Sequence, residues 1–299
     1  MTRRNALPSL AAVEMRSLSV PELSRRTADL WREPVPPSFA NQLGRKLLRF
    51  AVTTRGLVAF GLITLGVMVR KLGVAPRVVH PLIRAHIARA GVKLLPMVLF
   101  VALALGFVVI GQTVSMLHSV GATEYLGTVM VTVIVRELGP LITALIVLSR
   151  AGTQNVIELA TARALGEVES LETLGIDPIH YLVVPRAIGM ALGVFALTVY
   201  LILGALGSGY LWAFFQDVPL RPGDYFSQIA AALSLLDFIT LTLKTTFFGI
   251  IIATVTCYHG LAQRLRLEEI SAATIRAMAQ SVVLCLVVDA LFLIIHLIA

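Results

Sequence analysis

The chain has 299 residues, of which 57% are hydrophobic and 14% are charged, and its mean hydropathy is +0.87. Because a water-soluble domain is usually about a quarter charged, much of this chain must be solvated by a bilayer, which excludes an ordinary soluble enzyme. The formal charge of +8 does not indicate nucleic-acid binding, because 16 of the 25 Lys and Arg residues precede the first long apolar run, as in a cytoplasmic segment.

The first 45 residues (1–45) are polar and predict a flexible cytoplasmic tail. Three prolines, Pro34, Pro36 and Pro37, oppose a helix there, and little in the segment can be buried. No apolar h-region follows the basic residues at the start, so we expect no cleavable signal peptide. A plastid transit peptide is the alternative, since the stretch is rich in Arg and Ser, but its acidic residues argue against it.

Residues 57–69 (LVAFGLITLGVMV) form the first apolar stretch, which is only 13 residues long. A transmembrane helix needs about 20 residues. Basic residues flank the stretch on both sides, as is typical of a helix that lies in the cytoplasmic leaflet. We therefore predict an interfacial helix over 57–69, with a short, tilted first span as the alternative.

Five longer apolar runs follow, and each can cross the hydrocarbon as a helix, whose backbone groups are paired internally. The runs cover residues 94–117, 126–148, 181–215, 229–258 and 277–298. The connection 118–125 contains no Lys or Arg and the connection 216–228 contains only Arg221, whereas the connections on the other side contain several. The sequence therefore predicts an all-α polytopic membrane protein with five spans, its N-terminus inside and its C-terminus outside.

Small residues recur at four-residue spacing within these runs and would let helix backbones approach closely. Examples are Ala102 with Gly106, Gly189 with Gly193, and Gly204 with Ser208. We interpret these pairs as ordinary packing within one bundle rather than as a dimer seam.

Four charged residues fall near the middle of predicted spans: Arg136, Glu137, Lys244 and Asp289. A charge at mid-membrane costs about 2.5–3.5 kcal/mol, so these side chains must find partners or water. Arg136 and Glu137 are adjacent, about 100° apart around a helix, and cannot face each other. Depth and sign predict Lys244 with Glu137 and Asp289 with Arg136. The cluster is either a substrate or gating site, or a network of ion pairs that only fixes helix register.

A helix break is predicted beside this cluster, at Gly139 and Pro140. Pro140 has no N–H to donate to the carbonyl of Arg136, so that carbonyl is left free and the helix should bend. A bent, polar point at mid-membrane is what a substrate cavity or a gate requires.

The connection between the second and third runs contains a predicted amphipathic helix over residues 156–174. Acidic residues gather on one of its faces, namely Glu158, Glu169 and Glu172. Such a face does not favour anionic lipid, so it predicts contact with a protein; a solvated connecting helix is the alternative. Arg163 and Glu167 have the spacing of an ion pair between successive turns.

Several motifs follow one another in a fixed order along the chain. They are Arg136-Glu137-Leu138-Gly139-Pro140, Arg150-Ala151-Gly152, Glu158 with Arg163, Glu172 with Gly175-Ile176-Asp177-Pro178, Pro185-Arg186, and the segment 270–276. Together with Lys244 and Asp289 in the later runs, they closely resemble the MlaE-type family. The members of that family are permease subunits of ABC lipid transporters that work with MCE proteins. The resemblance begins near Arg45, so residues 46–299 are predicted to form one MlaE-type permease domain.

The resemblance implies a fold and a set of partners. It implies an N-terminal interfacial helix, five transmembrane helices and a homodimer with its lipid path near the dimer interface, in a bacterial inner membrane. The expected partners are a cytoplasmic ABC ATPase subunit, an MCE-domain periplasmic protein and, as a further candidate, a STAS-type accessory protein.

The resemblance also implies that the predicted helix 156–174 is a coupling helix that docks onto the ATPase. The residues expected in this coupling segment are Glu158, Arg163, Glu167, Glu169, Glu172 and Asp177. Family members commonly have Glu-Gln where this chain has Gly166-Glu167. Gly166 should weaken the helix by about 1 kcal/mol relative to Ala.

The sequence contains no G-x-x-x-x-G-K-[ST] phosphate loop, no HExxH motif and no nucleophile elbow. We therefore predict a transporter subunit without a cofactor, metal or catalytic residue of its own, whose ATP is bound by a partner subunit. The leading hypothesis is ATP-driven movement of phospholipid or a related lipid. One rival is an ion-coupled secondary transporter, in which Glu137 or Asp289 would carry a proton. The other is a membrane scaffold that transports nothing.

Overall fold

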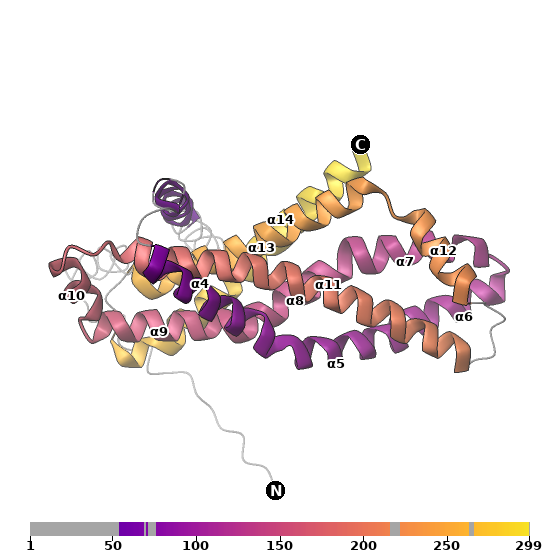
Figure 1. Cartoon of the computed structure of the whole chain (residues 1–299), viewed down its shortest axis with the longest axis horizontal. Helices are drawn as coiled ribbons and strands as arrows, with labels where there is room; N and C mark the ends of the chain where they lie inside the picture. Colours follow the sequence, from indigo (N-terminus) through magenta and orange to yellow (C-terminus); the bar gives the residue numbers. More distant parts are fainter. Residues whose placement is uncertain (1–53, 69, 71–75, 216–221, 263–265, 299) are drawn as a thin grey trace, which may run out of the picture. The chain divides into compact units, whose positions relative to one another are not determined.

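The computed structural model describes residues 54–68, 70, 76–215, 222–262 and 266–298. The regular elements in these ranges are all helices, and no strand occurs among them. Residues 57–299 form one unit, which contains five helices that are long and apolar enough to cross a membrane (Figure 1). The predicted all-α class with five spans is therefore confirmed. The predicted tail, residues 1–45, lies outside the described residues.

The first long helix, Val79–Val120, holds the predicted run 94–117. Its parts are α4 (Pro76–Ala90), η1 (Val92–Leu94), α5 (Leu95–Leu105), the π-helical turn η2 (Gly106–Ile110) and α6 (Gly111–Val120). The break after α4 comes at Gly91, and Pro96 lies in the first turn of α5, where its missing N–H has no cost. Gly121, with φ of 74°, ends α6 in the left-handed conformation that glycine adopts without strain.

The second long helix, Thr123–Ala164, runs on well past the predicted run 126–148. Its parts are η3 (Thr123–Tyr125), α7 (Leu126–Met130), the π-helical segment η4 (Val131–Leu138), α8 (Gly139–Val147), the π-helical turn η5 (Leu148–Gly152) and α9 (Thr153–Ala164). The predicted second span and the first part of the predicted coupling helix are thus one helix.

The predicted continuous helix over 156–174 is wrong. The chain turns at Gly166, whose φ is 78°, and a separate short helix α10 (Glu167–Thr173) follows. Gly166 therefore does more than weaken a helix, because a left-handed residue ends it. The acidic residues on either side of this turn do not share one helix face, since α9 and α10 are separate helices.

The remaining three long helices are Ile179–Phe215, Leu235–Leu261 and Leu267–His296. Their parts are η6 (Ile179–Val183), α11 (Val184–Phe215), α13 (Leu235–Leu261), η7 (Leu267–Glu269) and α14 (Ile270–Ile298). The predicted run 229–258 is not continuous, because α12 (Pro222–Ala232) ends before Ser234, which caps the start of α13. The Ser234 hydroxyl accepts the N–H of Asp237, whose carboxylate in turn accepts the N–H of Ser234.

Helix α11 lies at the centre of the packing and contacts α4, α5 and α13. One buried apolar cluster joins α5, α8, α11 and α13, and a second joins α6, α7, η4, α11 and α12. The chain from Arg136 to Pro140 runs between η4, in the second cluster, and α8, in the first. The polar segment of the second span is therefore held by packing on both sides.

Close approach of these helices depends on the small residues. A Cβ atom on Gly204 would lie 3.0 Å from Ala102, and one on Gly193 would lie 3.1 Å from Ala90. Gly106 faces Ser208, whose hydroxyl would collide with an added Cβ, and Gly189 faces His86. The predicted small-residue pairs thus pack against other helices of the same chain, as we interpreted them.

The short apolar helix Thr54–Met68 is confirmed at the N-terminal side of the spans. Within the unit 57–299, the Phe60 ring packs edge-on against Tyr258 of α13 at 5.8 Å between centroids, and Gly61 faces Thr254. Leu57 is buried, whereas Leu62 is 65% exposed. A helix this short, apolar on both its packed and its exposed sides, fits a position within one leaflet.

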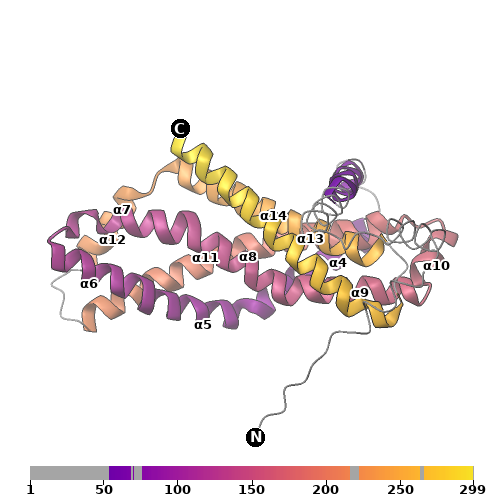
Figure 2. The ribbon, with the colours of Figure 1, turned by 180° about the vertical axis from the view of Figure 1, so that it is seen from behind.

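The start of α13 and the end of α14 run side by side, away from α11 (Figures 1 and 2). Their outer faces are apolar and exposed, with Leu235 at 82% and Ile239 at 64% exposure. Exposed aliphatic residues on long apolar helices are the expected contact with lipid chains or with other membrane helices.

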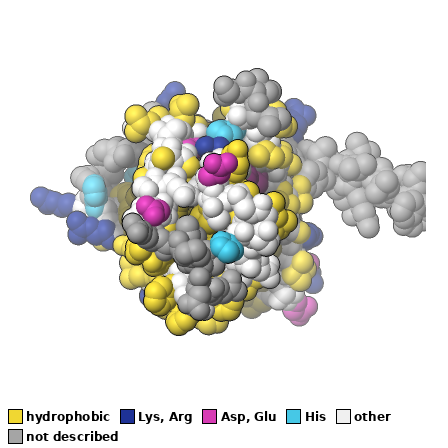
Figure 3. Space-filling model, turned by 90° about the vertical axis from the view of Figure 1, so that its right-hand side faces the viewer, with side chains coloured by type: hydrophobic (Ala, Val, Ile, Leu, Met, Phe, Trp, Pro, Cys, Tyr) yellow, Lys and Arg dark blue, Asp and Glu magenta, His cyan; other side chains and the backbone are white. Residues whose placement is uncertain are grey.

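Positive charge is unevenly distributed between the two ends of the spans. Helices α4, α9 and α10 lie at one end, and α6, α7 and α12 at the other (Figure 1). The helices α6, α7 and α12 contain no Lys or Arg, and this end presents mainly hydrophobic and uncharged side chains with isolated charged ones (Figure 3). Arg77, Arg84, Arg89 and Arg163 lie on α4 and α9. By the positive-inside rule, the α4 end is expected to be cytoplasmic.

This orientation can be tested by thiol labelling, because both native cysteines, Cys257 and Cys285, are buried. Ser119→Cys and Thr173→Cys place thiols at exposed positions of opposite ends. In intact cells an impermeant thiol reagent should label Ser119→Cys only, and Thr173→Cys should react after permeabilisation. Labelling of Thr173→Cys alone in intact cells would mean that the orientation is inverted.

Candidate functional site

The polar centre of the second span begins with the proline. Pro140 has no N–H, and the N–H of Gly139 donates to Ile134 five residues back, within the π-helical pattern of η4. The carbonyl of Arg136 is accordingly open, and the ammonium of Lys244 on α13 donates to it at 2.8 Å. The predicted interruption thus takes the form of a π-helical segment, and a side chain from another helix supplies the hydrogen bond that the proline withholds.

Lys244 also holds two carboxylates. Its Nζ lies 3.1 Å from Glu137 Oε2 and 2.7 Å from Asp289 Oδ1, and the residue is only 2% exposed. The predicted pairing of Lys244 with Glu137 is confirmed. The predicted pairing of Asp289 with Arg136 is wrong, because Asp289 contacts Lys244 instead. The buried ammonium therefore donates to one carbonyl and one carboxylate of the second span and forms an ion pair with a second carboxylate on α14.

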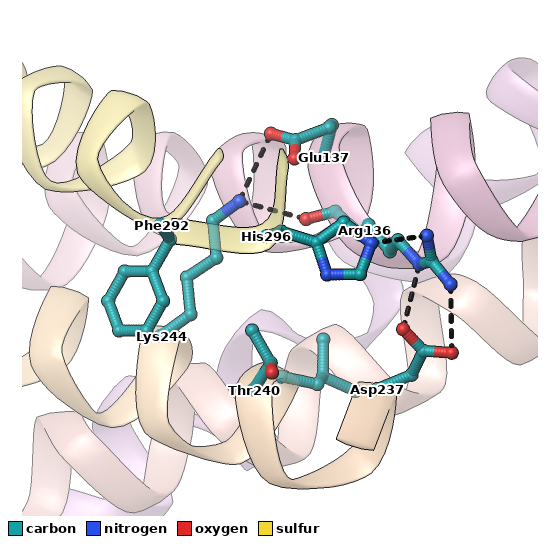
Figure 4. A pocket seen from close by; sticks show the side chains of 8 residues that line it. Arg136, Glu137, Asp237, Thr240, Lys244, Phe292 and His296 are labelled. Atoms are coloured by element: carbon teal, nitrogen blue, oxygen red, sulfur yellow. Dashed lines mark hydrogen bonds and ion pairs between the residues drawn. The ribbon is translucent and has the colours of Figure 1, made fainter. Parts of the chain in front are cut away.

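Arg136 is paired with Asp237, at the start of α13. Arg136 Nε lies 2.7 Å from Asp237 Oδ1, and Nη2 donates to Oδ2 at 3.1 Å, a two-pronged geometry (Figure 4). Asp237 Oδ2 also accepts the N–H and hydroxyl of Ser234, at 2.9 and 3.0 Å. One carboxylate therefore caps α13 and anchors the arginine of the second span.

Sequence reasoning missed Asp237 and His296. His296, near the end of α14, lies 2.6 Å from Arg136 Nη1 through its Nε2 atom. The spacing Ser234-x-x-Asp237 is a capping-box signature that could have marked the start of α13 and exposed Asp237 as a member of the site. For His296 the sequence offers no comparable signal, because its approach depends on how α14 packs.

These side chains line one pocket (Figure 4). Its lining comes from η4, α13 and α14 and consists of Arg136, Glu137, Asp237, Thr240, Leu241, Lys244, Phe292 and His296. The side chains of Arg136 and Glu137 are 26% and 30% exposed, whereas those of Lys244 and Asp237 are 3% exposed. The guanidinium of Arg136 and the carboxylate of Glu137 thus face the accessible space. Their buried partners, Asp237 and Lys244, fix their positions. Such a pair can bind a group that carries both a negative and a positive charge.

The predicted coupling residues separate into two groups. Glu158 lies on α9, where its carboxylate contacts Arg89 of α4 at 2.9 Å and Arg186 of α11 at 3.1 Å. Glu167 and Glu172 lie on α10 and are exposed, and Glu169 on the same helix is half-buried. The structure therefore does not bring Glu158 together with the acidic residues of α10.

The remaining predicted coupling residues are Arg163, Glu167 and Asp177. Arg163 and Glu167, predicted to pair, form no ion pair in the described part of the chain, because Gly166 turns the backbone between them. Asp177 Oδ1 accepts the N–H of Ile179 at 3.0 Å, in the turn that leads into η6 and α11. Buried Val168 anchors α10, packing in one cluster with Leu159.

Five long apolar helices, three of which line a charged pocket, define a multi-pass membrane protein, and charged groups within such helices are typical of transporters. A sequence model of the family described as Permease MlaE matches residues 83–295. The chain therefore belongs to the MlaE permease family, and it is the permease subunit of an ABC transporter.

Relatives extend over most of the chain. A probable ABC transporter permease protein of Rickettsia typhi is 29% identical over 251 residues, which are 84% of this chain and 94% of that protein. The intermembrane phospholipid transport system permease protein MlaE of Haemophilus influenzae is 25% identical over 256 residues, covering 84% and 95%. A probable ABC transporter permease protein of Synechocystis is 35% identical over 146 residues, covering 47% and 53%.

The geometry around Lys244 predicts an order of destabilisation. Lys244→Met should lower the free energy of unfolding by about 3–5 kcal/mol, because it leaves buried acceptors without their cation. Glu137→Leu should cost clearly less, since Lys244 keeps Asp289 and the Arg136 carbonyl. Thr240→Val, in the same pocket but outside every ion pair, is the matched control. Denaturant unfolding of the purified variants measures the order; equal costs for Lys244→Met and Glu137→Leu would contradict it.

Proposed function

We propose that this permease moves phospholipid, or a related lipid, between a bacterial inner membrane and an MCE-domain partner, driven by ATP that a partner ATPase subunit hydrolyses. The observation that carries the proposal is the pocket between η4, α13 and α14. A phospholipid headgroup of the zwitterionic kind presents a phosphate and an amine, which suit the accessible Arg136 and Glu137. The relative from Haemophilus influenzae is named as a phospholipid transport permease, which supports this substrate class.

The surroundings of the pocket favour a ligand with hydrocarbon chains. Phe292 lines the pocket, and exposed apolar side chains of α13 and α14 flank it, including Ile239, Leu243 and Leu291. An amphiphile could place its headgroup against the charges and its chains along these faces. The same exposed faces of α13 and α14 can be covered by a second copy of the chain, which is our reason to propose a homodimer.

The proposed site of ATPase docking is α10. This helix is short, lies at the basic end of the spans and presents exposed Glu167 and Glu172. Its buried residue Val168 packs in one cluster with Leu159 of α9. A movement imposed on α10 by the ATPase would therefore reach the long second helix, which carries Arg136 and Glu137.

Transport in reconstituted vesicles tests the function. The chain, assembled with its ATPase subunits, should move fluorescent phospholipid when ATP is added. Glu137→Gln keeps the size of the side chain and should leave assembly intact. Loss of a charge-assisted contact to the headgroup should slow transport roughly tenfold or more. Movement driven by a pH gradient without ATP would support a secondary transporter, and no movement under either condition would support a scaffold.

Charge reversal on α10 tests the docking site. Glu167→Lys with Glu172→Lys should weaken association with the ATPase subunit, because two exposed acidic contacts become repulsive. Folding should change by less than about 0.5 kcal/mol, as is usual for exposed substitutions. The matched control is Glu124→Lys with Asp224→Lys, at exposed positions of the opposite end. Equal co-purification of the ATPase with both double variants would rule out this docking face.

A further inference from the structure

Glu158 contacts residues of two other helices and does not line the charged pocket. Its Oε1 accepts Arg89 at 2.9 Å and the amide of Gln154 at 2.8 Å, and its Oε2 lies 3.1 Å from Arg186. We call Arg89, Glu158 and Arg186 the Glu158 bridge. Each of the three comes from a different helix: α4, α9 and α11.

The bridge connects helices that otherwise pack with different neighbours. Helix α9 packs along α13 and α14, whereas α4 packs along α11. Among the described residues, no comparably extensive packing joins α9 to α4 or to α11. The backbones of α4 and α11 are fitted together at Gly189 and Gly193, which face His86 and Ala90. Glu158 therefore ties α9 to both helices of the α4–α11 pair, beside the buried contact of Asn155 on α9 with Met190 on α11 at 3.7 Å.

The two arginines of the bridge are held differently. Arg186 is 7% exposed, and its Nη1 donates to the carbonyl of Leu182 in η6 at 2.8 Å, so it is fixed at the start of the third long helix. The Arg89 side chain is 36% exposed, and that of Glu158 is 32% exposed. Ion pairs that remain hydrated contribute little to stability, and they can open and re-form. The Arg89–Glu158 pair is thus the side of the bridge that can open, whereas Arg186 is held in place.

Glu158 lies on the helix that connects α10 to the charged residues of the second span. Glu158 lies two turns before Gly166, where α9 turns into α10, and upstream the same helix reaches Arg136 and Glu137. Helix α4 leads through Gly91 into the first long span. A displacement of α10 can pass along α9, and Glu158 is the residue of α9 that contacts Arg89 of α4.

We propose that Glu158 is a positioning residue that makes α4 follow α9 when the ATPase moves α10. This inference rests on the proposed function. In it, Glu158 keeps its contact with the fixed Arg186 and carries α4 through the more mobile Arg89. The N-terminal side of the first span then moves in step with the helix that bears the charged pocket. Without the carboxylate, α9 and α4 move independently, and ATP is hydrolysed with less lipid moved.

The test uses the full chain assembled with its ATPase subunits in vesicles. Glu158→Gln keeps the shape and a carbonyl acceptor but removes the charge. The ratio of ATP hydrolysed to lipid moved should rise at least about fivefold, the low end of usual coupling between two sites. Glu158→Asp, which keeps the charge, should restore part of the coupling. Glu268→Gln, the same change at an exposed glutamate on the chain segment before α14, is the matched control.

A distance measurement separates this role from a merely structural one. Spin labels at His80→Cys on α4 and Ser149→Cys on η5, both exposed positions, should give one narrow distance distribution with and without ATP. In Glu158→Gln the distribution should broaden when ATP binds. Arg89→Gln removes the other partner of the Arg89–Glu158 pair and should also broaden the distribution when ATP binds. This variant tests the inference if Glu158→Gln folds poorly.

An unchanged ratio and an unchanged narrow distribution in both variants would overturn the inference. Failure of the proposed function looks different, because the wild-type protein would then move no lipid with ATP. The label distances still decide in that case whether Glu158 makes α4 follow α9.

Discussion

In the middle of a bilayer there is no water to replace a missing backbone hydrogen bond, and the second span of this protein contains a proline there. Lys244 resolves that constraint by donating to the Arg136 carbonyl. The same ammonium forms ion pairs with Glu137 and Asp289, so a backbone defect and two membrane-embedded carboxylates share one cation. The charged pocket includes this arrangement, because Lys244 and Glu137 both line it and are in contact there.

The arrangement also dictates how closely the helices must pack. For the Lys244 side chain to reach the second span, α13 has to lie against its neighbours. Gly249 of α13 lies where a Cβ atom would come within 2.5 Å of Ala191 of α11, and Gly139 lies against Ile202 of α11. Small residues on these helices therefore position the charged group as well as fill space. The Arg136–Asp237 pair adds a second link, between the second span and the capped start of α13.

Much of this could be predicted from the sequence, because length and hydropathy decide which segments can cross a membrane. The Arg136 carbonyl that Pro140 leaves open could be predicted from helix geometry. The contact of Lys244 with Glu137 could be predicted from their opposite charges and similar depth. The partner of Asp289 could not be predicted, because depth and charge do not reveal whether α14 places Asp289 beside Arg136 or beside Lys244. Asp237 was overlooked because apolar residues on both sides of Ser234 conceal the break between α12 and α13. The turn at Gly166 was underestimated, since a helix-period pattern says nothing about a residue with positive φ.

The central claim is that Lys244 compensates the carbonyl that Pro140 leaves open, and a double-mutant cycle tests it directly. In Pro140→Ala the new N–H can donate to the Arg136 carbonyl, so Lys244 has one acceptor less to satisfy. The unpaired carboxylates left by Lys244→Met are common to both backgrounds and cancel. The cost of Lys244→Met in the free energy of unfolding should therefore be smaller in Pro140→Ala than in the wild type, by about 0.5–3 kcal/mol. Equal costs in the two backgrounds would contradict the account.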